Sequence, residues 1–254
     1  MNSKVKAIFF TFTAVIAITM IACNKSGGAA SGGGSKSFNS AEELKAYLDK
    51  QAVNGPDKSI NISMAINDTM LKSVADVVKS ANKYVSLNIS GNALTAIPDE
   101  AFRGCDTLSA ITIPNSVTSI GRSAFSSCTS LASVNIPDSI TSIEGWAFSS
   151  CSNLASVIIP TSITSIGEAV FYDCASLTNV TIPASVTSIG NSAFGRCNGL
   201  TSVKFEGRIA SDNFADYNVF GSTFPGDLRT KYLAGGIGTY TTKNPGTDPT
   251  WTKQ

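Results

Sequence analysis

The sequence contains no histidine, and charged residues make up only 15% of its 254 residues. The absence of histidine excludes a Ser-His-Asp triad, a Cys-His dyad and every zinc site that depends on imidazole. With 19 basic and 18 acidic side chains, the formal net charge is +1. Nucleic-acid binding needs clustered Lys or Arg, so we expect no nucleic-acid partner.

Catalytic motifs are also missing from the chain. There is no Gly-rich phosphate loop and no pair of carboxylates at catalytic spacing. Between Cys105 and Leu200 only seven side chains carry a charge. We therefore expect a protein that is not an enzyme, with no catalytic residues, no cofactor and no metal site.

The amino terminus has the pattern of a targeting segment rather than of a folded element. Lys4 and Lys6 precede an uncharged, mostly apolar run over residues 7–21, which is short for a membrane-spanning helix. The run ends in MIAC, and a small residue before Cys23 resembles a bacterial lipobox. The resemblance implies cleavage before Cys23 and a diacylglycerol on its sulfur. The alternative is an ordinary secretory signal with an incidental cysteine.

A Gly/Ser-rich segment follows, reading NKSGGAASGGGSKS over residues 24–37. This composition is typical of a flexible tether, with a reach on the order of 20 Å for a chain of this length. A lipid followed by such a tether would hold a folded body away from a membrane surface.

The folded body begins with a helix signal. Ser40 followed by Glu43 is a capping box, and Leu44, Tyr47 and Leu48 then share one helical face. The pattern predicts an amphipathic helix that starts just after Ser40.

Extended and helical patterns alternate over the next residues. Apolar side chains alternate over 60–66, recur at helical spacing over 71–78, and alternate again over 84–90. Asp68 is the expected N-cap of the helix. A strand, a helix and a strand of these lengths predict a right-handed parallel crossover, and hence an α/β cap before the repeats.

One phrase of 23 residues then recurs through the chain, each unit reading Leu-x-x-Val-x-Ile-Pro, then Ser-Val-Thr-Ser-Ile-Gly, then Ala-Phe-x-x-Cys. The residues that keep this step are Cys105, Cys128, Cys151, Cys174 and Cys197, Phe102, Phe125, Phe148, Phe171 and Phe194, and Leu108, Leu131, Leu154, Leu177 and Leu200. A fixed period between 20 and 50 residues predicts a solenoid. We expect one parallel β coil per unit, with a strand ended by proline and a short helical turn that places Phe and Cys inward.

The repeat resembles the BspA-like, treponemal class of bacterial leucine-rich repeats. The ending FPGDLRTKYLAGGIGTYTTK (residues 224–243) looks like the terminal cap of treponemal members, and LKAYLDKQ resembles their amino-terminal part. The resemblance implies a curved solenoid on a bacterial cell envelope that binds other proteins, often host proteins. Members have been linked to adhesion, although a fold alone does not establish a function.

The cysteines permit two interpretations. If Cys23 carries lipid, five cysteines remain, and an odd number cannot pair completely within one chain. Equivalent residues of stacked coils lie about 4.8 Å apart, which is within the range for a disulfide. However, their Cα–Cβ bonds are parallel, so we predict a ladder of buried free thiols that pack as small hydrophobes.

The residues between the inward Leu, Val and Ile of each strand should point outward and form a small, polar, nearly uncharged face. The expected protein-binding residues on this face are Thr112, Ser133, Asn135, Ser156, Ile158, Asn179, Thr181, Ser202 and Lys204. Trp146 departs from the repeat and is either a tolerated surface residue or a contact residue. The face offers no deep pocket for a small substrate.

The chain is thus expected to divide into five parts. These are a lipoprotein signal peptide (1–22), a tether (23–37), an α/β cap (38–86), the leucine-rich repeat solenoid (87–206), and a C-terminal cap and tail (207–254). The favoured function is a lipid-anchored envelope protein that binds a protein, host surface or matrix proteins included, or a glycan. The alternative is a structural or self-associating envelope component. We expect the outer membrane or cell surface rather than the inner membrane.

Overall fold

The computed structural model describes residues 35–215, 228–243 and 250–254. The expected signal peptide, Cys23 and most of the tether lie outside these residues. The first strand begins at Lys36, inside the range expected for the tether, because Lys36, Ser37 and Phe38 pair in parallel with the next strand.

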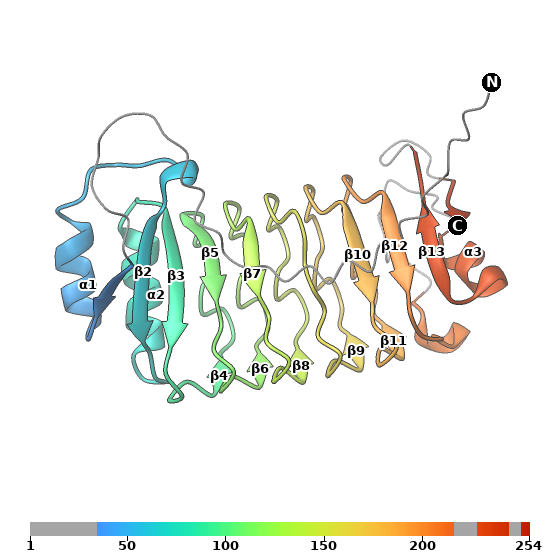
Figure 1. Cartoon of the computed structure of the whole chain (residues 1–254), viewed down its shortest axis with the longest axis horizontal. Helices are drawn as coiled ribbons and strands as arrows, with labels where there is room; N and C mark the ends of the chain where they lie inside the picture. The colour runs from blue at the N-terminus through green and yellow to red at the C-terminus, as the bar shows by residue number, and fades with distance from the viewer. Residues whose placement is uncertain (1–34, 216–227, 244–249) are drawn as a thin grey trace, which may run out of the picture. The chain divides into compact units, whose positions relative to one another are not determined.

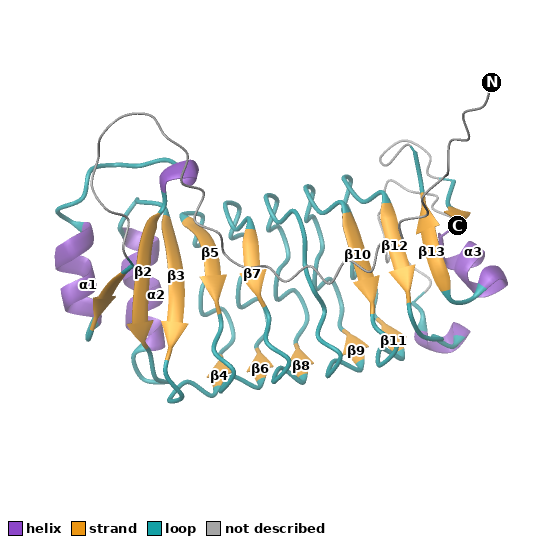
Figure 2. Ribbon diagram, viewed as in Figure 1, coloured by secondary structure: helices purple, strands orange, loops and turns teal. Residues whose placement is uncertain are grey.

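The described elements are short strands with few helices (Figures 1 and 2). The helices are α1 (Ala41–Leu48), α2 (Leu71–Ser80), α3 (Leu228–Gly235) and the 3-10 helices η1 (Pro56–Lys58) and η2 (Ser211–Asn213). The strands are β1 (Lys36–Phe38), β2 (Ile60–Ala65), β3 (Val85–Ser90), β4 (Ala96–Ile97), β5 (Leu108–Thr112), β6 (Ser119–Ile120), β7 (Ser133–Asn135), β8 (Ser142–Ile143), β9 (Ser165–Ile166), β10 (Asn179–Ile182), β11 (Ser188–Ile189), β12 (Ser202–Phe205), β13 (Gly238–Thr241) and β14 (Thr252–Lys253).

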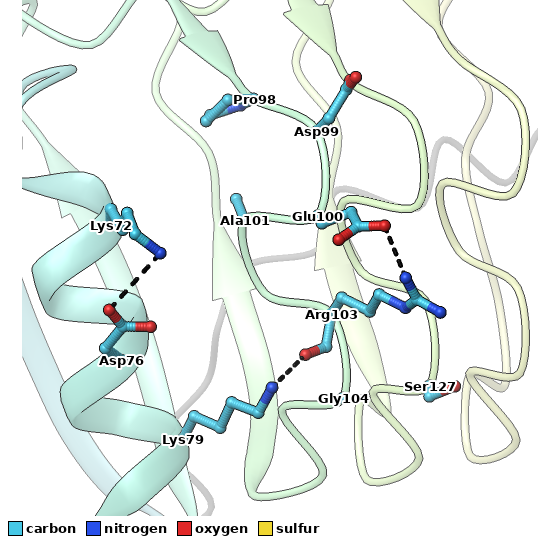
Figure 3. Close-up of a pocket in the computed structure, with 10 residues that line it drawn as sticks. All are labelled: Lys72, Asp76, Lys79, Pro98, Asp99, Glu100, Ala101, Arg103, Gly104 and Ser127. Atoms are coloured by element: carbon cyan, nitrogen blue, oxygen red, sulfur yellow. Dashed lines mark hydrogen bonds and ion pairs between the residues drawn. The ribbon is translucent and has the colours of Figure 1, made fainter.

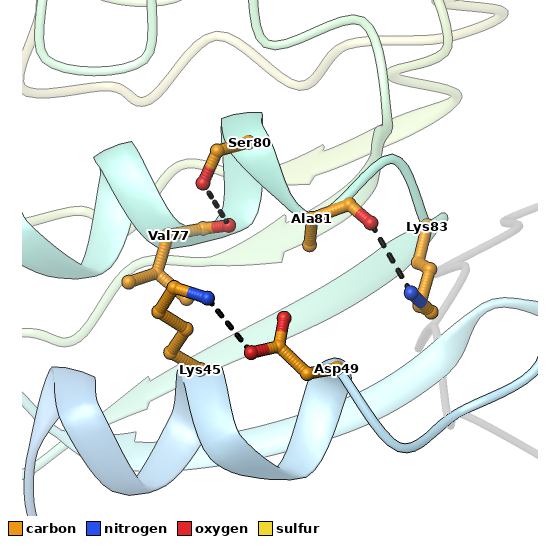
Figure 4. Close-up of polar contacts among 6 residues, drawn as sticks. All are labelled: Lys45, Asp49, Val77, Ser80, Ala81 and Lys83. Atoms are coloured by element: carbon orange, nitrogen blue, oxygen red, sulfur yellow. Dashed lines mark hydrogen bonds and ion pairs between the residues drawn. The ribbon is translucent and has the colours of Figure 1, made fainter.

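The amino-terminal cap is the α/β unit that the sequence predicts. Strands β1, β2 and β3 are parallel neighbours, and α2 connects β2 to β3. In Figure 1, α2 lies behind β2 and β3 and α1 lies at the end of the molecule beside β1, and the apolar side of each helix is buried. Figure 4 shows the polar side of the pair, where Lys45 Nζ lies 2.7 Å from an Asp49 carboxylate oxygen on the exposed surface.

The start of α1 confirms the predicted cap, whereas the predicted N-cap of α2 is wrong. Ser40 Oγ accepts the amide hydrogen of Glu43 at 3.2 Å. Helix α2 instead begins at Leu71, and Asn67 Oδ1 accepts the Met70 amide at 2.9 Å. Asp68 is not available as a cap because its carboxylate accepts two hydrogen bonds from Thr95, each of 3.0 Å. Asp68 therefore joins the cap to the first coil.

The predicted leucine-rich repeat solenoid with a 23-residue period is confirmed. We number its coils as the first (85–107), second (108–130), third (131–153), fourth (154–176) and fifth (177–199). Strands β5, β7, β10 and β12 form one row along the molecule, and β4, β6, β8, β9 and β11 form a second row (Figure 2). Pairing in both rows joins residues 23 apart, for example Ala110 with Ser133 and Ser119 with Ser142.

The remaining side of each coil is a series of hydrogen-bonded turns, which we call the turn side. Backbone amides here donate to carbonyls of the following coil, as from Phe102 to Ala124 O at 2.7 Å and from Phe125 to Ala147 O at 2.7 Å. Two residues per coil, four positions apart, have positive φ, and glycine occupies few of these sites. They are Glu100 and Gly104, Ser123 and Ser127, Trp146 and Ser150, Ala169 and Asp173, and Ser192 and Arg196.

Phenylalanine rings form a continuous stack inside the turn side. Neighbouring rings from Phe102 to Phe194 are almost parallel, with centroids 5.2–5.6 Å apart, and each ring is buried. The stack fills the coil interior with the same side chain at each level. The equal spacing follows from the hydrogen bonds between coils, which fix the distance between successive rings.

The cysteine ladder is also confirmed as five buried free thiols. Four of them also donate a hydrogen bond, which the sequence did not predict. Cys128 Sγ lies 3.0 Å from the Phe102 carbonyl oxygen, which also accepts the Cys105 amide. The same pair of donors converges on Phe125 O, where Cys151 Sγ lies at 3.2 Å. Each such thiol therefore satisfies a buried carbonyl of the preceding coil.

The third and fourth coils are joined less completely than the others, and we call this contact the central junction. Strand pairing stops after β7 in one row and after β8 in the other, and resumes beyond this junction. The predicted strand of the fourth coil is reduced to a single bridge between Ser156 and Asn179. The turn side continues unbroken, with Trp146, Phe148 and Ser150 amides donating to the fourth coil. The ring spacing of 5.6 Å here is the widest among the described phenylalanine pairs.

Gly167 and Gly190 occupy the same place in the repeat, at the central junction and at the junction of the fourth and fifth coils. Substitution of each should show that the second junction is more tightly packed. A Cβ at Gly190 would lie 2.8 Å from the Glu168 amide nitrogen, whereas the nearest atom to one at Gly167 is 3.5 Å away. Gly190→Ala should therefore lower the free energy of unfolding by about 1–3 kcal/mol through overpacking. Gly167→Ala should have little effect in the same urea titration. Equal destabilisation by both variants would contradict the conclusion that the coils pack more loosely at the central junction.

The buried thiols also predict a loss of stability in alkali. Burial raises the pKa of Cys105 to about 11 and that of Cys174 to about 12, from the ordinary value near 9. The folded state thus holds thiol protons that the unfolded state releases, so the unfolding free energy should be constant below about pH 8 and fall above it. Each thiol contributes a slope of about 1.4 kcal/mol per pH unit.

Urea titrations between about pH 7.5 and pH 10 measure this loss. The control is Cys151→Ala, which should be less stable at neutral pH but show a shallower decline, because it carries one buried thiol fewer. An unfolding free energy that does not change up to about pH 10 would show that the thiols ionise without cost.

Candidate functional site

The strands of the solenoid present an outer face, which we call the strand face. Its nine expected residues lie in two columns that run across the coils. Strand pairing places Thr112 beside Asn135, and it joins Asn179 to Ser202 and Thr181 to Lys204. The isolated bridge places Ser156 beside Asn179. The structure therefore brings the predicted residues together on one surface, at the spacing of neighbouring strands except across the central junction, where no strand pairing is formed.

Most polar side chains of the strand face form no hydrogen bond or ion pair with other described residues. Thr112 and Ser202 are partly exposed, and the other seven of the nine residues are exposed. Among the described residues, Asn179 donates to its neighbour Thr178, and Lys204 pairs with Glu206 at 2.7 Å. No side-chain hydrogen bond within the described part of the chain involves Ser133, Asn135, Ser156, Thr181 or Ser202. Their donors and acceptors are free to meet another molecule.

Ile158 is the apolar exception on this polar surface. It is 66% exposed and belongs to the fourth coil, where the strand row is interrupted. Its neighbours in the chain, Val157 and Ile159, point inward and are buried. A single exposed isoleucine is common on protein surfaces. Here it lies in the middle of the strand face, between Asn135 of the third coil and Thr181 of the fifth.

Trp146 lies on the turn side, away from the strand face. It is partly exposed, as the sequence suggested, and its φ of 63° places it in the left-handed region. The indole contacts the ring of Tyr172 in the next coil, with centroids 5.8 Å apart. The sequence identified Trp146 as a departure from the repeat, but it did not predict the contact with Tyr172.

A pocket of about 590 Å³ lies between α2 and the turns of the first coil (Figure 3). This pocket could not be predicted from the sequence, because its lining comes from separate segments that only the fold brings together. Most of its charged side chains pair with one another: Arg103 pairs with Glu100 at 2.6 Å, and Lys72 lies 3.8 Å from Asp76. Asp99 accepts the Arg122 amide at 2.7 Å. Lys79 Nζ donates to the Arg103 carbonyl oxygen at 2.8 Å. This pocket therefore offers paired charges and no activated nucleophile.

The thiols are poorly suited to chemistry at neutral pH. A thiolate is the reactive form of cysteine, and burial raises the pKa of all five solenoid thiols. Within the described ranges, no group of three or more Cys, Asp or Glu side chains is placed to hold a metal ion. None of the helices in those ranges has the length and apolar character needed to span a membrane.

Three solved bacterial structures illustrate the likeness of the chain to known proteins. A leucine-rich repeat protein of T. pallidum is 37% identical over 47% of this chain and 58% of its own, with a TM-score of 0.46. A leucine rich cell surface protein from Faecalibacterium prausnitzii is 30% identical over 64% and 48%, with a TM-score of 0.41. A leucine-rich repeat protein from Eubacterium ventriosum is 23% identical over 59% and 38%, with a TM-score of 0.45.

The chain spans less than two thirds of the length of each of these proteins. A search of curated proteins gives no match. The decisive comparison is with a family model for the BspA type leucine rich repeat region, which matches residues 85–220 in six copies. This match covers more than half of the chain and follows the coils described above. The chain therefore belongs to the BspA-type leucine-rich repeat family.

Proposed function

We propose that the protein is a non-catalytic, lipid-anchored component of a bacterial cell envelope that binds another protein through its strand face. Leucine-rich repeat family members are generally binding or scaffold proteins, so the family suggests a protein-interaction or structural role. The observation that carries the proposal is the set of unpaired polar side chains on the strand face, from Ser133 to Ser202.

The composition of the strand face supports a protein partner. Protein interfaces combine an apolar centre with a polar rim, and they carry roughly one hydrogen bond per 100–200 Å². Ile158 supplies an exposed apolar side chain near the middle, and hydroxyl and amide groups of the neighbouring coils surround it. Among the nine residues only Lys204 is charged, and Glu206 pairs with it, so a partner would not have to remove water from unpaired charges.

The proposed anchor rests on the sequence before the described residues. MIAC at the end of a short apolar run, followed by a Gly/Ser-rich tether, supports lipidation of Cys23 and display at the outer membrane or cell surface. A structural or self-associating role remains the competing function, and the experiments below separate the two.

Site-specific cross-linking should identify the binding face. A photoreactive benzoylphenylalanine in place of Ser156 on the strand face should capture a different protein on intact cells, and one in place of the exposed Thr141, outside the strand face, should not. Ile158→Glu should reduce the captured yield at least about tenfold, as expected for loss of an interface hot spot. Cross-links that join only copies of this chain would instead support self-association. Equal capture from both positions would contradict binding by the strand face.

Replacement of the proposed lipidated residue tests the anchor. Cys23→Ala should move the protein from the membrane fraction to the soluble fraction and abolish labelling by a fatty-acid analogue. The neighbouring variant Ser26→Ala should behave as the parent does. If the Cys23→Ala protein still partitions into detergent, the lipoprotein assignment is wrong. Protease treatment of intact cells then tests exposure, since a surface protein is digested and a periplasmic one is protected.

A further inference from the structure

Three large side chains form a cluster on the turn side, across the third, fourth and fifth coils. We call Trp146, Tyr172 and Arg196 the aromatic–arginine patch. The Trp146 and Tyr172 rings lie 5.8 Å apart at an angle of 54°, and the Arg196 guanidinium carbon lies 5.9 Å from the centroid of Tyr172. The two aromatic residues are partly exposed and Arg196 is exposed. The patch is therefore accessible to solvent on a different side of the coils from the strand face.

The repeat itself does not need these side chains, because most of the other coils have small residues at the same positions. The residues at the same positions of the other coils are Glu100, Ser123, Ala169 and Ser192 for Trp146, Arg103, Ser126, Ser149 and Gly195 for Tyr172, and Gly104, Ser127, Ser150 and Asp173 for Arg196. The same turns form in those coils with the same hydrogen bonds. The three large residues are thus additions to a framework that is complete without them.

The position of Trp146 is costly for a bulky residue. Its φ of 63° lies in the left-handed region, which disfavours side chains other than glycine by roughly 1–2 kcal/mol. The hydrogen bond that the position supplies comes from the backbone, where the Trp146 amide donates to Glu168 O at 2.9 Å. Any residue except proline would supply this bond. The equivalent residues Ser123, Ala169 and Ser192 have the same positive φ, so the backbone conformation belongs to the repeat and the large side chain is the departure.

The Tyr172 ring is held in place by the next coil. A Cβ at Gly195 would lie 2.7 Å from Cδ2 of Tyr172, so the ring rests directly on backbone where other coils carry a side chain. Arg196 then lies over the Tyr172 ring, within the range of a cation–π contact. The patch is thus arranged before any ligand arrives, which lowers the entropic cost of binding.

The groups of the patch indicate the chemistry of a ligand. Within the described part of the chain, Arg196 makes no ion pair, so its guanidinium is free to bind a carboxylate through two parallel hydrogen bonds. The two tilted rings provide an apolar platform beside it. Exposed large aliphatic side chains among the described residues are Val53, Ile158, Leu233 and Ile237, and none of them belongs to the turn segments.

A stable protein interface of standard size buries about 800 Å² on each partner around an apolar core, whereas the patch offers two aromatic rings and one guanidinium. A small polar ligand with one apolar face and one carboxylate fits the patch better. A sugar ring presents such a face of C–H groups, and sialic and hexuronic acids add the carboxylate. We propose that the aromatic–arginine patch is a binding subsite for an acidic sugar residue of a glycan. This proposal is independent of protein binding by the strand face.

Titration of the full chain with defined sugars tests the proposal. The probes are 3′-sialyllactose and trigalacturonic acid as the two acidic sources, with lactose as the neutral control. Calorimetry and ligand-observed NMR should show saturable binding of at least one acidic probe, with lactose at least about tenfold weaker. Quenching of tryptophan fluorescence should accompany binding, and Trp146→Phe should remove most of it because Trp251 is buried.

Three variants introduce serine, which occupies the same positions in other coils, and should therefore keep the fold. Trp146→Ser, Tyr172→Ser and Arg196→Ser should each weaken the acidic probe at least about tenfold, with unchanged circular dichroism. Arg196→Lys keeps the charge but loses the planar fork, and should fall between Arg196→Ser and the parent.

The proposal is wrong if neither acidic probe binds the parent protein, or if lactose binds as tightly as 3′-sialyllactose. It is also wrong if Trp146→Ser and Arg196→Ser bind the acidic probe as the parent does. Loss of a cross-linked protein partner in these variants, without any sugar binding, would identify the patch as a protein contact and would likewise overturn the proposal. The sugar-binding results do not bear on the Ser156 cross-linking experiment.

Discussion

Hydrogen bonding between one coil and the next is the constraint on which the rest of the solenoid depends. On the turn side, backbone amides reach carbonyls 22 residues further along the chain, as from Phe102 to Ala124. This spacing can be kept only if each coil has the same length, so the 23-residue period follows from the hydrogen bonds. The stacked rings, the thiol ladder and the strand columns are all consequences of that one repeat distance.

The thiols show how a buried polar atom is satisfied without a charged group. The Phe125 carbonyl oxygen accepts the Cys128 amide and also the Cys151 thiol of the next coil. A thiol is a weak donor with the volume of a small apolar group, so it can fill the core and still contribute a hydrogen bond. The cysteines are therefore matched to the solenoid by size and by donor capacity, and their reactivity is suppressed by burial.

Much of the fold could be predicted from the sequence because identical side chains recur at a fixed step. The phenylalanine stack, the free thiols and the β2–α2–β3 crossover all follow from periodicity. Features that depend on backbone geometry could not be predicted. The positive φ of Ser123 or Ala169 leaves no mark in composition, and the thiol hydrogen bonds depend on distances between coils. Asp68 is a residue type that often caps helices, but its carboxylate accepts a hydrogen bond from Thr95 instead of capping α2.

The candidate sites were predictable to different degrees. Alternation along each strand placed Ser133, Asn135 and Thr181 on the outer face, because side chains of a strand alternate strictly between its two sides. Trp146 was recognisable as an exception to the repeat. Its contact with Tyr172 was not, since the two residues occupy different positions in the 23-residue unit and meet only because one coil lies beside the next.

The central junction has a consequence for how the molecule carries mechanical load. Paired strands resist tension on both rows of most coil contacts, but both rows stop between the third and fourth coils. The described hydrogen bonds that cross this contact come chiefly from the turn side, so tension there falls on one side of the coil. Under a pulling force, the third and fourth coils would separate first on the two strand rows, while the hydrogen bonds of the turn side act as a hinge. This separation would occur before either half of the solenoid unfolds.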